Sequence, residues 1–167
     1  EIRSYEDLLN ALKRRHDYFH SLGCRVSDYG VDTVWYKGAF YYEVEDTFKK
    51  AISSSEEIAP DEILAFKSAM LLECAAMDYD KGWVRQLHIG PMRNNNTAMF
   101  EKLGPDAGFD SMGESNYALS LSRHLDKLNS QEKLGKTILY NINPKDNEMI
   151  ASMLGNFQDS VSYTHLT

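Results

Sequence analysis

Three short apolar runs separated by helical patterns are the feature that most restricts how this chain can fold. The runs lie at residues 24–28, 83–88 and 136–141, and each has the length of a β-strand. Helical periodicity occurs before, between and after these runs, at residues 4–22, 40–52, 60–80, 114–128 and 145–154. Helices between successive strands make the strands parallel, so we expect an α/β fold. Three strands cannot close a barrel of about 250 residues, which leaves a small open sheet or a slice of a (β/α)8 barrel.

Capping signals support the helix boundaries. Ser4 is followed three residues later by Asp7, which matches a capping box with a short acidic partner. Gly23 suits the end of the first helix. Pro60 suits the first turn of the longest helix, and Gly82 follows its end.

Composition and missing motifs exclude several classes of function. A chain of 167 residues is long enough for one domain with a sizeable core, and its net charge of −7 argues against a nucleic-acid partner. No apolar run approaches the roughly 20 residues of a membrane helix. Cys24 and Cys74 form no metal or redox motif, which favours reduced thiols in a cytoplasmic protein. The absence of a P-loop, of GxGxxG and of a nucleophile elbow removes support for kinase, dinucleotide oxidoreductase and serine hydrolase functions.

A polar residue stands at the end of each apolar run. These residues are Asp28, His88 and Asn141. The carboxyl ends of parallel strands emerge at one edge of a sheet, where α/β proteins place their sites, so the three side chains should lie near one another. A carboxylate and an imidazole there could transfer protons or help to bind a metal. Alternatively, Asp28 caps the following turn and His88 is a hydrogen-bonded core histidine, and spacing alone favours this second interpretation.

The loop after the second run carries another candidate site. Arg93 is followed by three asparagines at 94–96. The arginine fork matches a carboxylate or phosphate, and amides suit sugar hydroxyls. The alternative is a solvated loop in which Asn96 caps a helix that starts near Thr97.

His16 and His20 are four apart on the first predicted helix, a spacing that can bind zinc. No glutamate follows the first histidine, so an HExxH motif is absent. We therefore favour a surface or interface role for this pair.

The amino-acid sequence of the central loop resembles that of a known protein family, and this resemblance is more specific than any of the patterns above. QLHIGPMRNNNTAMFEKLGPDAGFDSMGE is similar to the signature region of uronate isomerase, also called glucuronate isomerase. Three more segments resemble the family in the same order: RRHDYFHSLGCRVSDYG, AFKSAMLLECAAMDYDKGWV and KTILYNINPKDNEMIASMLGNFQ. The resemblance extends over residues 1–158.

This resemblance implies a fold and a function. It places the chain in the amidohydrolase superfamily, with a distorted (β/α)8 barrel and a divalent metal, usually zinc. It implies a cytoplasmic enzyme that interconverts D-glucuronate and D-fructuronate, or D-galacturonate and D-tagaturonate, by proton transfer between C2 and C1. A hexuronate is thus the implied substrate, with no nucleic-acid or membrane partner, and a homo-oligomer is left open for the full-length enzyme.

The resemblance also implies roles for individual residues. Asp28 and His88 are the expected catalytic residues, and Arg93 and Asn95 are the expected substrate-binding residues. Tyr29 stands where many relatives have histidine. The family's metal site uses an upstream His-x-His pair and a downstream aspartate, neither of which occurs here. We therefore expect an internal piece of the barrel, carrying strands four to six, with the metal ligands outside it.

The sequence of residues 159–167 does not resemble that of the family, and we interpret these residues as an atypical, non-native tail. The expected function is a uronate isomerase segment that is inactive in isolation. The first alternative is a non-catalytic α/β module that binds sugar acids. The second is an α/β interaction domain whose exposed strand edges pair with another chain.

Overall fold

The structure is a computed structural model, and it describes residues 1–53 and 57–158. The expected tail at 159–167 lies outside the described residues. Within them, the elements follow the order α1 (Tyr5–Ser21), β1 (Val26–Val31), α2 (Tyr41–Ser53), α3 (Pro60–Asp80), β2 (Val84–Ile89), β3 (Pro91–Met92), α4 (Thr97–Leu103), β4 (Ser111–Met112), α5 (Ala118–Ser130), β5 (Thr137–Asn141), a 3-10 turn at Pro144–Asp146 and α6 (Asn147–Leu154). None of the helices in this part of the chain is long and apolar enough to cross a membrane.

The main sheet has three strands in the order β1-β2-β5, and both pairings are parallel. This confirms the predicted α/β fold with parallel strands. The register aligns Val26 with Val84 at one end of the first pair and Val31 with Ile89 at the other. In the second pair, Ile89 aligns with Asn141.

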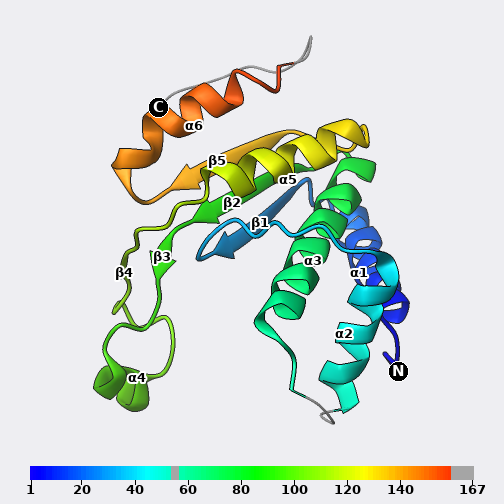
Figure 1. The fold of residues 1–167 in the computed structure, drawn as a ribbon, viewed down its shortest axis with the longest axis horizontal. Coiled ribbons are helices and arrows are strands. Elements are labelled where there is room, and N and C mark those ends of the chain that lie inside the picture. The colour runs from blue at the N-terminus through cyan, green and yellow to red at the C-terminus, as the bar shows by residue number, and fades with distance from the viewer. Residues whose placement is uncertain (54–56, 159–167) are drawn as a thin grey trace.

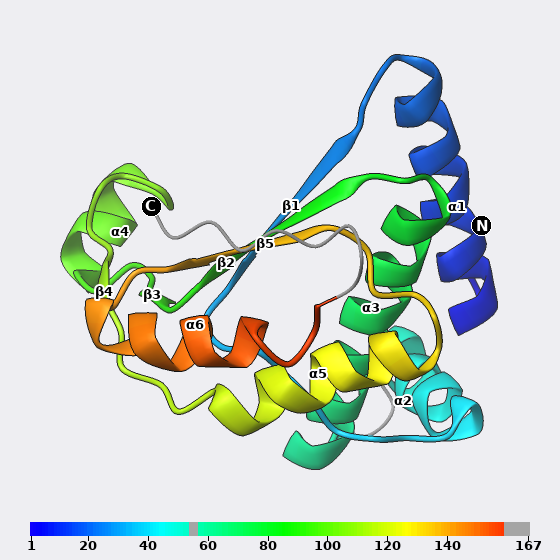
Figure 2. The same ribbon diagram turned by 90° about the horizontal axis from the view of Figure 1, so that it is seen from above.

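Helices cover one face of this sheet. Helices α3, α5 and α6 lie along that face in the ribbon views (Figures 1 and 2), and the main core lies between them and the strands. Every second residue of β2 points into this core, so Arg85, Leu87 and Ile89 are buried. The opposite face of the described sheet carries His88 and several exposed apolar side chains: Val26, Ile138 and Tyr140.

A second, smaller core joins the first three helices. Tyr5 of α1 packs with Val44 and Phe48 of α2 and with Phe66 of α3. The capping box at the start of α1 is complete, because the Ser4 hydroxyl accepts a bond from the Asp7 amide at 3.0 Å and the Ser4 amide donates to the Asp7 carboxylate at 3.1 Å. The prediction of this cap is confirmed.

The structure corrects the first predicted strand. The strand starts at Val26, not at Cys24, because the Cys24 amide still bonds to the Phe19 carbonyl as the chain leaves α1. It continues to Val31 along β2, so Asp28 lies inside the strand and not at its carboxyl end.

Two further differences lie in and after the central loop. Helix α5 begins at Ala118, later than the predicted start at 114, since the preceding residues connect the ribbon β3-β4 to the helix. The ribbon and α4 project from the carboxyl ends of the main strands (Figure 1). Asn96 caps α4 as expected, with its side chain accepting the Met99 amide at 3.1 Å.

Candidate active site

Asp28 and His88 form a hydrogen-bonded pair on the bare face of the sheet. The Nδ1 atom of His88 lies 2.7 Å from Oδ1 of Asp28, and both side chains are partly exposed. An ionised carboxylate can only accept, so Nδ1 carries the proton and donates it. Nε2 therefore keeps its lone pair, and no described residue bonds to it.

The parallel register explains why these two residues meet. Asp28 is aligned with Gln86, and Gly30, two residues further along β1, is aligned with His88. Residues two apart on a strand share a face, so Asp28 and His88 project from the same face of neighbouring strands. The sequence predicted both residues for one site, and the structure brings them together although Asp28 is not at a strand end.

Tyr140 adjoins this pair on the third strand. It is aligned with His88, and its ring stacks on the imidazole with centroids 4.4 Å apart and planes 5° apart. No sequence motif marks Tyr140 as a site residue. Its position could have been inferred from Asn141, the residue that follows it. If Asn141 ends its strand level with Ile89, then Tyr140 lies beside His88.

Arg93 reaches the same region from the loop after β3. Its Nη1 donates to Oδ2 of Asp110 at 2.7 Å, while the backbone amide of Asn94 donates to Oδ1 at 2.8 Å. The amide bond and the guanidinium together lower the pKa of the Asp110 carboxyl below its usual value. Asp110 is thereby kept as a charged anchor for Arg93.

Gly30 makes room for the arginine. A Cβ built on Gly30 would lie 3.6 Å from Nη2 of Arg93, which is ordinary van der Waals contact. Gly30 is also the neighbour of His88 across the sheet. The guanidinium therefore occupies space that a larger side chain at this position would fill.

Asn95 supports the loop instead of facing the site. Its side-chain amide donates to the carbonyls of Met92 and Phe109, at 2.7 and 3.3 Å. Asn141 has a similar role after β5, where its amide donates to the Asn143 carbonyl and to the Asn147 side chain, at 2.7 and 2.9 Å. Both amides are thus engaged in local structure.

These elements enclose one open depression of about 630 Å³. Its lining residues come from β1, β2, the ribbon with its loop and the residue after β5: Asp28, Gly30, His88, Pro91, Arg93, Asp110, Ser111, Met112 and Ile142. A proton-transfer pair and a cation therefore share one surface hollow, whereas Asn95 and Asn141 are not part of its lining.

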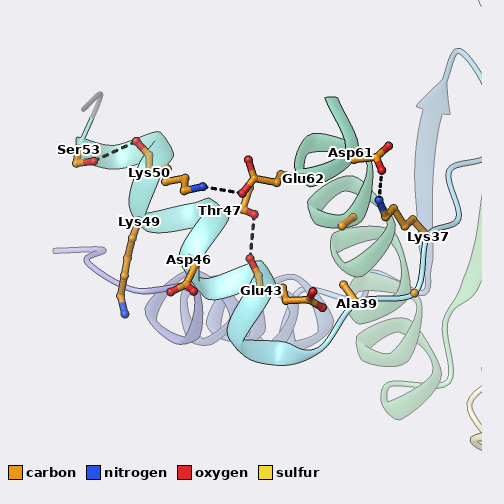
Figure 3. A pocket seen from close by; sticks show the side chains of 12 residues that line it. Lys37, Ala39, Glu43, Asp46, Thr47, Lys49, Lys50, Ser53, Asp61 and Glu62 are labelled. Carbon is orange, nitrogen blue, oxygen red and sulfur yellow. Dashed lines mark hydrogen bonds and ion pairs between the residues drawn. The ribbon is translucent and has the colours of Figure 1, made fainter. Parts of the chain in front are cut away.

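A second depression, of about 530 Å³, lies between α2 and α3 (Figure 3). Two ion pairs occupy this hollow, and Figure 3 shows them as Lys37 with Asp61 and Lys50 with Glu62. The Thr47 hydroxyl donates to the Glu43 carbonyl at 2.9 Å. This hollow is lined by ion pairs and contains no histidine, so it is the weaker candidate for proton transfer.

A buried carboxylate on the other face of the sheet anchors β1. Asp78 of α3 accepts bonds from Ser27 Oγ at 2.6 Å, from Tyr29 OH at 3.0 Å and from His16 Nε2 at 3.1 Å. Ser27 and Tyr29 flank Asp28 in the strand, so this anchor sets where Asp28 projects. Burial, followed by the nearby Cys74 and Asp78, raises the pKa of Tyr29 far above its ordinary value. Tyr29 therefore belongs to this buried network and not to the depression.

The two helix histidines also have structural partners. The His16 ring stacks on Trp83 at 5.0 Å, and Nδ1 of His20 accepts the Trp83 indole N–H at 2.9 Å. Both therefore hold the start of β2 against α1, as the interface interpretation expected.

The family resemblance raises the question of a metal. Within 1–53 and 57–158, no group of three or more His, Cys, Asp or Glu side chains is arranged to hold an ion. Asp28 and His88 supply only two donor groups, and these bond to each other. The described residues do not fit a metal centre of their own.

Comparisons with known proteins show which family this chain resembles in sequence. A family model described as glucuronate isomerase matches residues 1–167. The chain is 52% identical over 158 residues to a uronate isomerase of Cellvibrio japonicus and 50% identical over 158 residues to one of Bacteroides fragilis, covering 95% of this chain in both cases.

Two crystal structures are similar to the fold. One is a uronate isomerase from Thermotoga maritima, with a TM-score of 0.85, 29% identity and coverage of 93% of this chain. The other is a glucuronate isomerase from Caulobacter crescentus, with a TM-score of 0.77, 27% identity and coverage of 88%. The chain spans about a third of the curated relatives it matches, 33% and 34% of their length, and 34% and 30% of the two solved chains.

Proposed function

The chain belongs to the glucuronate isomerase family, and we propose that it forms one wall of the active site of a uronate isomerase. The proposed reaction interconverts D-glucuronate and D-fructuronate, or D-galacturonate and D-tagaturonate. The observation that carries the proposal is the hydrogen-bonded pair of Asp28 and His88 in the same depression as Arg93.

We propose that the sheet is part of a (β/α)8 barrel. All strands of the main sheet are parallel and their helices lie on one face, as they do on the outside of such a barrel. The bare face with His88 would then line the interior. The depression lies toward the carboxyl ends of the strands, the end at which barrel enzymes carry their active sites.

His88 is the proposed acid–base residue. An aldose–ketose isomerisation moves one proton between C2 and C1 and a second between the oxygens on these carbons, and the carbon-bound proton needs a group that can take and return it. Nε2 of His88 has a free lone pair and lies in a residue that lines the depression. Asp28 holds the tautomer through Nδ1 and stabilises the imidazolium that forms when Nε2 takes the proton.

Arg93 is the proposed anchor for the substrate carboxylate. A guanidinium binds a carboxylate through two parallel N–H bonds. Nη1 is held by Asp110, and Nη2 extends over Gly30 beside the level of His88. Asn95 supports this arrangement by holding the loop, through bonds to backbone carbonyls.

The resemblance also implies a divalent metal, with zinc as the expected ion. Since the described residues supply no ligand set for it, the proposed role of this chain is limited to proton transfer and carboxylate binding. An enzyme of this kind would act on a free hexuronate in the cytoplasm.

A chimeric enzyme tests the proposal. Residues 1–158 would replace the matching segment of the Cellvibrio japonicus uronate isomerase, with which they share 52% identity. We expect the chimera to convert D-glucuronate to D-fructuronate, and His88→Gln to lower kcat by about 10²- to 10⁴-fold. Ile138→Val, on the same face of β5, is the matched control. A folded chimera without turnover, or a His88→Gln variant with normal kcat, would refute the proposed role.

A further inference from the structure

We infer that Tyr140 is a positioning residue of this site, which holds the imidazole plane of His88 while Asp28 holds its Nδ1 atom. The inference deepens the proposed function and rests on the use of His88 in that function. It is carried by the stacking of the two rings, 4.4 Å between centroids and 5° between planes.

The stacking follows from strand pairing. His88 and Tyr140 are aligned neighbours on the parallel strands β2 and β5. Neighbouring strands lie about 4.8 Å apart, so two flat side chains projecting from aligned positions come to ring-stacking distance. The arrangement therefore holds as long as the register holds.

Asp28 alone does not fix the ring. One hydrogen bond to Nδ1 leaves the imidazole free to swing about that contact, and the second side-chain torsion of histidine is broad. A parallel ring against one face removes that freedom. Together the two contacts set the direction of the remaining nitrogen, Nε2.

On the side of His88 that faces β1, no side chain of the aligned residue contacts the imidazole ring. The residue aligned with His88 on β1 is Gly30, which has no side chain, and Arg93 lies over it. Among the described residues, Tyr140 makes the ring contact that fixes His88 in the direction across the sheet. Loss of its ring would let the imidazole move toward β5.

Tyr140 acts through its aromatic ring and not through its hydroxyl group. Tyr140 is not among the residues that line the depression, whereas His88 is. No described residue bonds to its hydroxyl. Phenylalanine should therefore replace tyrosine with little loss, whereas an aliphatic residue should not.

The first arm of the test needs no turnover. In the isotope-labelled chain, carbon-13 relaxation of the His88 ring would be compared in wild type, Tyr140→Phe and Tyr140→Leu, with Ile138→Leu as the control on the same strand face. We expect a rigid ring in wild type, Tyr140→Phe and the control, and a clear fall in ring order in Tyr140→Leu. An equally rigid ring in Tyr140→Leu overturns the inference. If that variant fails to fold, Tyr140→Met decides by the same measurement.

The second arm uses the chimeric enzyme. We expect Tyr140→Leu to lose about tenfold in kcat with KM changed less than about twofold, because an orienting contact acts on the proton transfer and not on carboxylate binding. Tyr140→Phe should keep at least half of kcat. A Tyr140→Phe variant as slow as Tyr140→Leu would assign the effect to the hydroxyl and overturn the inference. A wild-type chimera without turnover would sink the proposed function alone, since the relaxation arm still decides the role of Tyr140.

Discussion

Arg85 of β2 donates a hydrogen bond from Nη1 to Nε2 of His124 of α5 at 3.0 Å, in the layer between sheet and helices. Both side chains are buried, with 3% and 0% of their surface exposed. A guanidinium can only donate, so Nε2 is the acceptor and the His124 proton lies on Nδ1, which has no partner among the described residues. Burial, aided by the charge of Arg85, lowers the pKa of His124 to about 3.

The His124 pair predicts a pH dependence of stability. An unfolded histidine has a pKa of about 6.5, so between about pH 6.5 and pH 3 the unfolded chain binds a proton that folded His124 does not. The free energy of unfolding should therefore fall as the pH drops through this window, by up to about 1.4 kcal/mol per pH unit from this residue. Urea unfolding at several pH values checks this. His124→Gln should show a shallower slope than the wild type, and identical slopes in the two proteins would contradict the prediction.

Asp28→Asn should disable the proposed base without disturbing the fold. The amide can donate to the histidine ring, which would favour the tautomer with its proton on Nε2. In the chimeric enzyme we expect kcat to fall by about 10²- to 10⁴-fold. Nitrogen-15 spectra of the imidazole should show the change of tautomer. Asp32→Asn, in the exposed loop after β1, is the control, and an unchanged tautomer in Asp28→Asn would count against the proposed pairing.

Gly30→Val should weaken substrate binding. The β-branched side chain would extend into the space of the Arg93 guanidinium, whereas the single Cβ of Gly30→Ala makes only ordinary contact at 3.6 Å. We expect KM for D-glucuronate to rise about tenfold in the valine variant of the chimera, as one charge-assisted bond is lost. The alanine variant should stay near wild type. Gly38→Val, at a position with open space around it, should leave KM unchanged, and a normal KM in Gly30→Val would remove Arg93 from the substrate site.

Asp78→Ala should cost more stability than any surface change. Three donors lose their acceptor in a buried layer, and the charge of Asp78 also counters the burial that lowers the pKa of Arg85. We expect the free energy of unfolding to fall by about 3–5 kcal/mol. Asp80→Ala, which breaks the exposed ion pair with Lys133, should cost less than about 1 kcal/mol. Chemical denaturation of both variants makes the comparison, and equal losses would show that the Asp78 network is not an anchor.

The chain alone should not turn over uronates. Its described residues hold an acid–base pair and a cation but no metal-ligand group. With zinc and D-glucuronate added, we expect no D-fructuronate, and turnover would overturn the division of the active site proposed here. Calorimetry on the same sample tests the sugar-acid-binding module, which requires tight binding of glucuronate without metal.

Local signals predicted the helices well. Pro60 and the glycine at 82 bracket α3, which runs from Pro60 to Asp80 as expected. Ser4 and Asp7 form the predicted capping box. These features depend on residues within one or two turns of each other, and the physics that places them is written in the local sequence.

Pairings between distant segments could not be read in this way. The apolar run that predicts the first strand ends at Asp28, whereas β1 continues to Val31 because it pairs with β2 along that length. Tyr140 carries no local signal because its partner His88 lies on another strand, and the register between the two strands cannot be read from the sequence. Arg85 and His124 gave no signal either, since a charged residue in an apolar run has no visible partner until a helix packs against it.

The sequence alone determined that this is a parallel α/β chain related to uronate isomerases. Two features carried that conclusion: the short strands between helices and the amino-acid sequence of the loop after His88. Only the tertiary structure decided that Asp28 bonds to His88, that Tyr140 stacks on the same ring and that Arg93 lies over Gly30. The reason is physical. Periodicity and capping act along the chain, whereas side-chain geometry across a sheet depends on register, and a shift by one residue would turn each of these side chains to the opposite face.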